Sequence, residues 1–287
     1  MKVGIDSHSG FCGGVIRAIT TAEKYLDSCP EPWTGVLYSL GSIVHNEEEL
    51  ARLGSKGLTA VSSIEDVPGG SRVLVRAHGV PPEVYGRARE RGLEVIDCTC
   101  PVVLKIQKSI REAEGTVLIF GKHGHPEVLG LVGQTSGAYV FQNIGQLEEV
   151  LRSVDPAGPV DVFSQTTMSP VEYEQACAMI SEALPQAVIH RTICSQVASR
   201  HRQLAEFAAS YDVVVFVSGR ESSNGKVLCE LCRSVNPSTY HIGGPAELNP
   251  EWFAGAGSAG VCGATSTPKW LLEKVASAIA DMAAEKK

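Results

Sequence analysis

The sequence lacks the long apolar runs that a membrane protein needs. No stretch of about 18 consecutive apolar residues occurs in the chain, so no transmembrane helix is predicted. The opening residues, MKVGIDSHSGFCGG, contain no apolar core of the kind found in secretory signal peptides. We therefore expect a cytoplasmic protein with no membrane partner.

An excess of positive charge is also missing. The 25 Lys and Arg residues are outnumbered by 32 Asp and Glu residues, which gives a formal net charge of −7. A protein that binds nucleic acid usually presents a basic surface to the phosphate backbone, so no nucleic acid partner is expected. A few local side chains could still hold a small anion.

Nucleotide-binding motifs are absent too. The chain has no Walker lysine motif, and its glycines do not fit the dinucleotide fingerprint, so neither ATP nor NAD is implied. The sequence does contain nine cysteines. Without an export signal, these are expected to bind metal, take part in catalysis or pack in a core rather than form disulfides.

Apolar runs typical of β-strands recur along the chain and alternate with amphipathic helical patterns. This alternation predicts parallel sheets covered by helices on both faces, an α/β fold with two or three domains. The runs are VLYSL (36–40), RVLVRA (72–77), LEVID (93–97), TVLIFG (116–121), VDVFS (160–164) and DVVVFVSG (212–219).

Three cysteines occupy equivalent places in this pattern. Cys12, Cys100 and Cys194 each stand where a β-segment leads into a helix, at similar spacings, as in a weak threefold repeat. The positive end of a helix dipole favours a thiolate. Ligands of parallel α/β domains bind beyond the carboxyl ends of the strands. Three thiolates could therefore meet there and hold either zinc or a cubane iron–sulfur cluster.

Polar residues gather at the other predicted strand ends. His45, His78 and His125 each follow an apolar run, and hydroxyl-rich segments such as SQTTMSP, SGRESSNG and GATSTP end later runs. A lone histidine is commonly structural, but imidazoles, hydroxyls and helix amino ends together suit a phosphate or diphosphate. Glu127 is the only carboxylate in the histidine-rich loop, and a buried carboxyl group can donate protons.

Nine motifs, in order, resemble the 4-hydroxy-3-methylbut-2-enyl diphosphate reductase family over essentially the whole chain. They are GFCGGVIRAI, VHN, RAHGV, TCPVV, GHPEVLG, QTTMS, TIC, ESSN and ATSTP. The resemblance implies three α/β domains with mainly parallel sheets, arranged as a pseudo-threefold cloverleaf around a central iron–sulfur cluster. The expected domains are 13–97, 98–193 and 194–287, the last completed by an amino-terminal strand within 1–12.

The resemblance also implies roles for individual residues. Cys12, Cys100 and Cys194 would hold a [4Fe-4S] cluster with one open iron. Glu127 would supply the proton, with Thr166 orienting the substrate hydroxyl beside it. The implied substrate-binding residues are His45, His78, His125, Thr166, Ser222, Ser223, Asn224 and Ser266.

The implied reaction is the last step of the methylerythritol phosphate route to isoprenoids. The allylic hydroxyl of (E)-4-hydroxy-3-methylbut-2-enyl diphosphate would be removed with two electrons and two protons, giving isopentenyl or dimethylallyl diphosphate. Because the chain carries no flavin or nicotinamide motif, the electrons would come from a ferredoxin or flavodoxin.

One departure from the family pattern keeps another function open. Val197 stands where most members of the family have a threonine, so a hydrogen bond near Cys194 is expected to be missing. This permits a non-catalytic iron–sulfur paralogue with a redox-sensing role. A zinc hydrolase is a second alternative, although no zinc-type ligand spacing appears.

The remaining cysteines and histidines are not expected to be ligands. Cys98 lies close to Cys100, but only Cys100 directly precedes Pro101 and so takes the helix-start position. The pair Cys229 and Cys232 lacks a second pair and is predicted to pack in a core. Ordinary roles are likewise expected for Cys29, Cys177, Cys262, His123 and His201.

Overall fold

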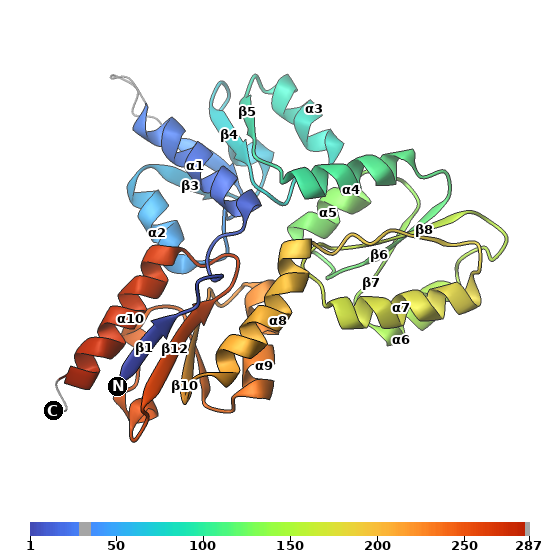
Figure 1. Ribbon diagram of the computed structural model, residues 1–287. Coiled ribbons are helices and arrows are strands. Elements are labelled where there is room, and N and C mark those ends of the chain that lie inside the picture. The colour runs from blue at the N-terminus through green and yellow to red at the C-terminus, as the bar shows by residue number, and fades with distance from the viewer. Residues whose placement is uncertain (29–35, 285–287) are drawn as a thin grey trace. The chain divides into compact units, whose positions relative to one another are not determined.

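The computed structural model describes residues 1–28 and 36–284 and shows strands alternating with helices along the chain (Figure 1). In chain order the strands are β1 (Lys2–Ile5), β2 (Leu37–Leu40), β3 (Leu58–Val61), β4 (Arg72–Val75), β5 (Glu94–Asp97), β6 (Thr116–Phe120), β7 (Ala138–Phe141), β8 (Val160–Ser164), β9 (Val188–Ile189), β10 (Val213–Val217), β11 (Thr239–Ile242) and β12 (Ser258–Gly263).

Helices connect these strands. The α-helices are α1 (Gly13–Asp27), α2 (Glu47–Ser55), α3 (Pro82–Glu90), α4 (Pro101–Glu112), α5 (Pro126–Val132), α6 (Ile144–Leu151), α7 (Pro170–Ala183), α8 (Ser195–Ala209), α9 (Ser223–Val235) and α10 (Lys269–Ala284). Three short 3₁₀ helices are η1 (Ile64–Asp66), η2 (Pro245–Glu247) and η3 (Pro250–Phe253).

Within the described residues the strands form three parallel sheets of four strands each. Their orders are β1-β12-β10-β11, β3-β2-β4-β5 and β7-β6-β8-β9. The α/β prediction is therefore confirmed, and all six predicted strands are present.

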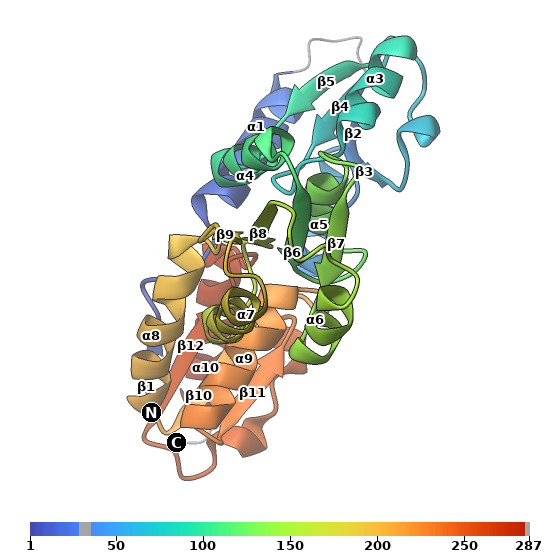
Figure 2. The ribbon, with the colours of Figure 1, turned by 90° about the vertical axis from the view of Figure 1, so that its right-hand side faces the viewer.

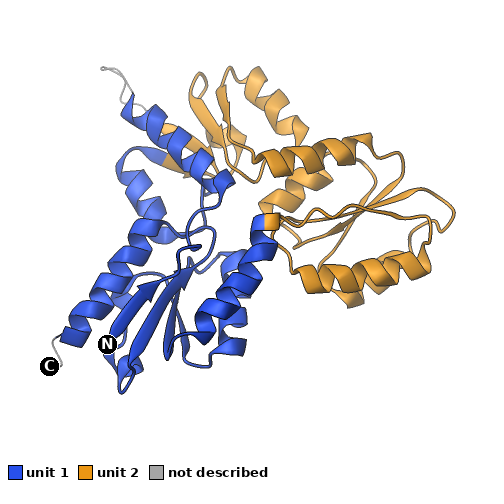
Figure 3. Cartoon of the chain, in the orientation of Figure 1, with its two compact units in different colours: residues 1–35, 42–58, 196–287 blue, residues 36–41, 59–195 orange. Residues whose placement is uncertain are grey.

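The chain divides into two compact units (Figure 3). Unit 1 comprises residues 1–35, 42–58 and 196–287, and unit 2 comprises residues 36–41 and 59–195. Unit 1 holds the sheet of β1, β12, β10 and β11, with β11 at its edge (Figure 2), and unit 2 holds the other two sheets. The three predicted domain boundaries stay a prediction.

The side chains of β10, one of the two inner strands of the unit 1 sheet, show how this sheet is covered on both faces. Successive side chains of a strand point to opposite faces. Val215 and Val217 pack in one core with α10, whereas Val214 and Phe216 pack in another with α8 and α9. A continuous apolar run is thus required because both faces of the strand are buried.

The same rule shapes the β6 sheet of unit 2. Leu118 and Phe120 belong to the core that includes residues of α6 and α7, while Val117 and Ile119 belong to the core with α4 and α5. The carboxyl ends of β6 and β8 then lead into α5 and α7. Residues that follow these strands therefore share one edge of the sheet.

Membrane-spanning helices and the cysteines outside the candidate site were also subjects of prediction. Among the described residues, no helix is long and apolar enough to cross a membrane. Cys229, Cys232 and Cys262 are buried in the core with α8 and α9, which confirms the predicted packing role of the first two. Cys29 lies outside the described residues.

Candidate active site

Cys12 of unit 1 stands at the end of the loop that joins β1 to α1. Gly10 in this loop has a φ of +134°, a conformation that side chains rarely adopt. Cys12 is extended, precedes the first residue of α1 and is only partly buried. Its amide donates to the Thr265 carbonyl oxygen at 3.2 Å. This contact fixes the cysteine against the segment that follows β12.

A buried ion pair supports the same loop. Arg200 of α8 donates through Nη2 to Asp6 Oδ2 at 2.9 Å and to Ser9 Oγ at 3.0 Å. Ser9 Oγ in turn donates to Asp6 Oδ2 at 2.7 Å. Burial raises the pKa of Asp6, but the Ser9 hydrogen bond and the Arg200 charge outweigh it and leave the pKa below its ordinary value.

The hydroxyl and amide groups predicted to bind diphosphate lie together in unit 1. Ser222 caps α9 by accepting from the Gly225 amide at 3.0 Å, and its Oγ lies 3.1 Å from Ser266 Oγ. Asn224 Nδ2 donates to Thr265 Oγ1 at 2.9 Å. The amino end of α9, where Ser223 is the first helical residue, thus meets the segment that follows β12.

His45 belongs to the same part of unit 1. A Cβ atom added at Gly219 would collide with the His45 carbonyl oxygen, so the turn after β10 passes directly over that backbone. The Arg220 amide donates to Glu47 Oε1 at 3.1 Å. The segment that carries His45 is therefore attached to the turn that leads to Ser222.

The acidic run after His45 forms the first turn of α2, with Asn46 as its cap. Glu49 is buried and pairs with Arg52 at 2.6 Å, and it also accepts from Trp270 Nε1 at 2.9 Å. These contacts give this glutamate a structural role within unit 1.

Cys100 of unit 2 precedes Pro101 at the start of α4, as the sequence predicted. Its amide donates to the Ala77 carbonyl oxygen at 3.0 Å, next to His78. Cys100 is partly exposed, whereas only 1% of Cys98 is exposed. The burial of the two side chains therefore favours Cys100 as the ligand.

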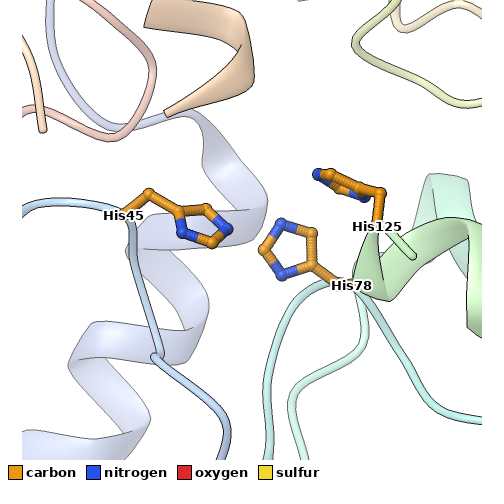
Figure 4. A group of neighbouring side chains, drawn as sticks. All are labelled: His45, His78 and His125. Carbon is orange, nitrogen blue, oxygen red and sulfur yellow. The ribbon is translucent and has the colours of Figure 1, made fainter. Parts of the chain in front are cut away.

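His78 and His125 approach each other within unit 2 (Figure 4). Their ring centroids are 5.4 Å apart and the rings are nearly perpendicular. His125 Nδ1 accepts from the Glu127 amide at 3.2 Å. Because Nδ1 accepts, a neutral His125 ring carries its proton on Nε2, which makes that atom a donor suited to an anion. His45, also drawn in Figure 4, belongs to unit 1.

Glu127 and Thr166 form a buried, hydrogen-bonded pair in unit 2. The Thr166 amide donates to Glu127 Oε1 at 2.6 Å, and Thr166 Oγ1 donates to Oε2 at 2.8 Å. Burial of the carboxyl group raises the pKa of Glu127 to about 7, although both hydrogen bonds act in the opposite direction. A carboxyl group with this pKa is suited to donate a proton near neutral pH.

Cys194 completes this arrangement in unit 2. Its amide donates to the Thr166 carbonyl oxygen at 3.0 Å, and α8 begins at the next residue. Cys194 is partly exposed, like Cys100. Val197, the departure from the family pattern, is 4% exposed in α8.

The predicted site residues thus fall into two groups. Each group is linked internally by hydrogen bonds or close contacts. The unit 1 group is Cys12, His45, Ser222, Ser223, Asn224 and Ser266, and the unit 2 group is His78, Cys100, His125, Glu127, Thr166 and Cys194. Thr265 joins the first group although it was not predicted; its place beside Ser266 in GATSTP was the available signal.

Comparison with known proteins gives a consistent result. Residues 3–280 match the family model described as LytB protein. The 4-hydroxy-3-methylbut-2-enyl diphosphate reductase of Bacteroides fragilis is 45% identical, with 97% of each chain covered. The protein of the same name from Porphyromonas gingivalis is 44% identical, covering 97% of this chain and 98% of that one.

Solved structures agree in fold. A structure of (E)-4-hydroxy-3-methyl-but-2-enyl diphosphate reductase matches with a TM-score of 0.73 at 32% identity, covering 98% of this chain and all of that one. The reductase from Plasmodium falciparum matches with a TM-score of 0.87 at 23% identity, covering 96% and 87% of the two chains. Because sequence and fold agree over nearly the full length, this chain belongs to the LytB protein family.

Proposed function

We propose that this chain removes the allylic hydroxyl of (E)-4-hydroxy-3-methylbut-2-enyl diphosphate by reduction, forming isopentenyl and dimethylallyl diphosphate. The observation in the structure that supports this proposal most strongly is the buried Glu127–Thr166 pair. The carboxyl group of Glu127 has a pKa of about 7 and lies beside the Thr166 hydroxyl group. The names of the relatives in its family support the same substrate.

Membership of the LytB family implies an iron–sulfur cofactor. The cysteines of this chain fit such a group in chemistry and exposure. Cys12, Cys100 and Cys194 are partly exposed at helix starts, whereas the other described cysteines are buried.

We infer that these three cysteines hold a [4Fe-4S] cluster with one open iron. When bound, the cluster would supply the two electrons and a Lewis-acidic iron for the hydroxyl oxygen. Cys12 and Cys100 stand directly before the first residues of α1 and α4, at the amino ends of these helices, where the helix dipole favours negatively charged ligands.

The protein groups would supply protons and hold the substrate. Thr166 Oγ1 donates to Glu127 and can at the same time accept from the substrate hydroxyl, which orients that hydroxyl beside the acid. Glu127 then protonates the departing oxygen, so that it leaves as water rather than hydroxide. A second proton and the two electrons complete the replacement of the C–O bond by a C–H bond.

Hydroxyl, amide and imidazole side chains would bind the diphosphate as hydrogen-bond donors. The hydroxyls of Ser222, Ser223 and Ser266 and the Asn224 amide lie at or beside the amino end of α9, whose dipole favours anions. His45, His78 and His125 would add imidazole donors. These assignments follow the family pattern, and the His125 tautomer described above suits the role.

The electron donor is proposed to be a ferredoxin or flavodoxin, and a cytoplasmic location stays a prediction. The alternative of a non-catalytic redox sensor is less well supported, because the Glu127–Thr166 pair is complete and buried. A sensor would not need a proton donor at this place. Zinc hydrolysis does not fit the family.

The experiment is anaerobic reconstitution with iron and sulfide, followed by EPR and Mössbauer spectroscopy before and after addition of the diphosphate substrate. We expect a four-iron signal that changes with substrate, and formation of both products with a reduced one-electron donor. A colourless protein that holds only zinc, or a cluster protein that forms no product, would contradict the proposal.

A further inference from the structure

Asn224 contains a buried acceptor whose hydrogen bond is missing. Only 6% of the residue is exposed, and its Oδ1 atom has no hydrogen-bond partner among the described residues. The other end of the carboxamide is satisfied, since Nδ2 donates to Thr265 Oγ1 at 2.9 Å. A buried polar atom left without a partner is costly, so this carboxamide is suited to a change of partner.

A diphosphate could not supply the missing bond in the present orientation. Its oxygens are acceptors, and Asn224 Oδ1 is an acceptor as well, so the two would repel each other. If the carboxamide rotates by half a turn about its last side-chain bond, Nδ2 takes the place of Oδ1. The amide then offers two donor hydrogens where it now offers an oxygen.

Thr265 can serve both orientations. A hydroxyl group donates as well as accepts, so Thr265 Oγ1 accepts from Nδ2 before the rotation and donates to Oδ1 after it. Valine has the same shape without this ability. The partner of Asn224 is thus a residue that keeps its hydrogen bond in either state.

We propose that Thr265 is a positioning residue for diphosphate binding: its hydroxyl holds the Asn224 carboxamide turned so that the amide hydrogens face the diphosphate. The inference deepens the proposed function and rests on it. Thr265 itself does not touch the reacting atoms in this proposal.

The main chain of Thr265 has a separate role that can serve as an internal control. Its carbonyl oxygen accepts from the Cys12 amide at 3.2 Å, and its neighbour Ser266 meets Ser222 at 3.1 Å. A change of the Thr265 side chain leaves that carbonyl in place. Cluster content should therefore be unaffected, while diphosphate affinity changes.

The test compares Thr265→Val with Thr265→Ser, each alone and in an Asn224→Ala background. All proteins are reconstituted without oxygen and checked for iron content and EPR signal. The affinity for inorganic diphosphate and for isopentenyl diphosphate is measured by calorimetry, and KM and kcat are measured with the allylic substrate.

We expect Thr265→Val to weaken diphosphate affinity and raise KM about 2- to 10-fold, with kcat within about twofold, because a carboxamide that Thr265 no longer restrains must be ordered when the diphosphate binds. Thr265→Ser should restore the affinity. In the Asn224→Ala background, Thr265→Val should cause little further loss of diphosphate affinity, because Thr265 acts through the Asn224 carboxamide, which this background lacks.

Parental affinity in Thr265→Val would overturn the inference, as would an undiminished effect of this substitution in the Asn224→Ala background. Either result would leave the proposed function standing, since the parent would still bind and convert the diphosphate. A parent protein that binds neither diphosphate would overturn the proposed function and this inference with it.

Discussion

Thr166 donates to both carboxyl oxygens of Glu127, from its amide at 2.6 Å and from its hydroxyl at 2.8 Å. These bonds join the segment after β8 to the first turn of α5. The carbonyl of the same Thr166 accepts from the Cys194 amide at 3.0 Å. One residue therefore positions the proposed acid and the backbone of a proposed cluster ligand.

Replacement of Glu127 by glutamine should lower kcat about a hundredfold or more, with cluster content and substrate affinity nearly unchanged. The amide keeps the size of the side chain but cannot deliver the proton. Steady-state kinetics with a reduced donor would measure the loss, and Glu172→Gln on the exposed first turn of α7 is the matched control. Parental turnover in Glu127→Gln would mean that the proton comes from elsewhere, such as the substrate's own diphosphate.

The pH dependence of kcat should follow Glu127. Burial raises the pKa of this carboxyl group to about 7, so the proton-bearing form dominates below that pH and is lost above it. We expect kcat to fall as pH rises through about 7, and the residual kcat of Glu127→Gln to lack this limb. If the kcat of the parent is constant or rises as the pH increases through about 7, Glu127 is not the general acid.

Two neighbouring cysteines should behave in opposite ways. Cys98→Ala is expected to keep a full cluster and activity, because Cys98 is 1% exposed and packs inside unit 2. Cys100→Ala is expected to lose or degrade the cluster, since two thiolates would remain. Iron and sulfide analysis with EPR on both variants, reconstituted side by side, decides the assignment. The reverse pattern would make Cys98 the ligand.

Ser266→Ala should weaken diphosphate binding more than it alters the cluster. It removes a donor to a charged ligand, worth about 1.5 to 3 kcal/mol, or roughly 10- to 100-fold in affinity. Calorimetry with isopentenyl diphosphate would show this, with Ser210→Ala at an exposed position as control. Asn224→Ala should weaken binding in the same way, and unchanged affinity in both would place the anion site elsewhere.

Asp6→Asn should destabilise unit 1 by about 3 kcal/mol, because it leaves the buried Arg200 charge without its counter-ion. Since the pKa of Asp6 is lowered in the folded protein, the stabilisation is present above its ordinary value and is lost as pH falls through the lowered one. Urea unfolding at neutral and acidic pH would measure both effects, with Asp281→Asn on the exposed side of α10 as control. Equal unfolding midpoints for Asp6→Asn and the parent would show that the pair contributes nothing.

The strands that could be predicted from sequence are those whose apolar runs are continuous. β6 and β10 are nearly or wholly buried along their length and were easily recognised. β9 has only two residues, and β12 is rich in small residues. In β12, Gly260 is required because a Cβ atom there would come within 2.7 Å of the Tyr211 ring, a contact that local sequence does not reveal.

Site residues could be predicted where a reactive side chain stands in the segment that follows a predicted strand, as Cys100 and Glu127 do. Partners distant in sequence were not predictable. Glu49, for example, lies in an acidic first helical turn that has no distinctive sequence pattern, yet it accepts from Trp270, which lies 221 residues further on. Thr265 was not predicted although it lies beside Ser266 in the hydroxyl-rich segment GATSTP, because that segment does not show which of its hydroxyl groups contacts Asn224.

The pairing of β1 with β12 has a consequence for the order in which the protein matures. Ser9 of the Cys12 loop binds the backbone of Gly263, 254 residues further along the chain, and among the described strands β1 pairs only with β12. During synthesis the amino-terminal part of a protein ordinarily folds first. Here the loop that carries Cys12 cannot reach its place until β12, which lies far along the chain from β1, has been made. If Cys12 is a ligand of the cluster, as we propose, loading of the cluster would follow the synthesis of β12, and a chain that stalls before this strand would lack the Thr265 carbonyl that holds the Cys12 amide.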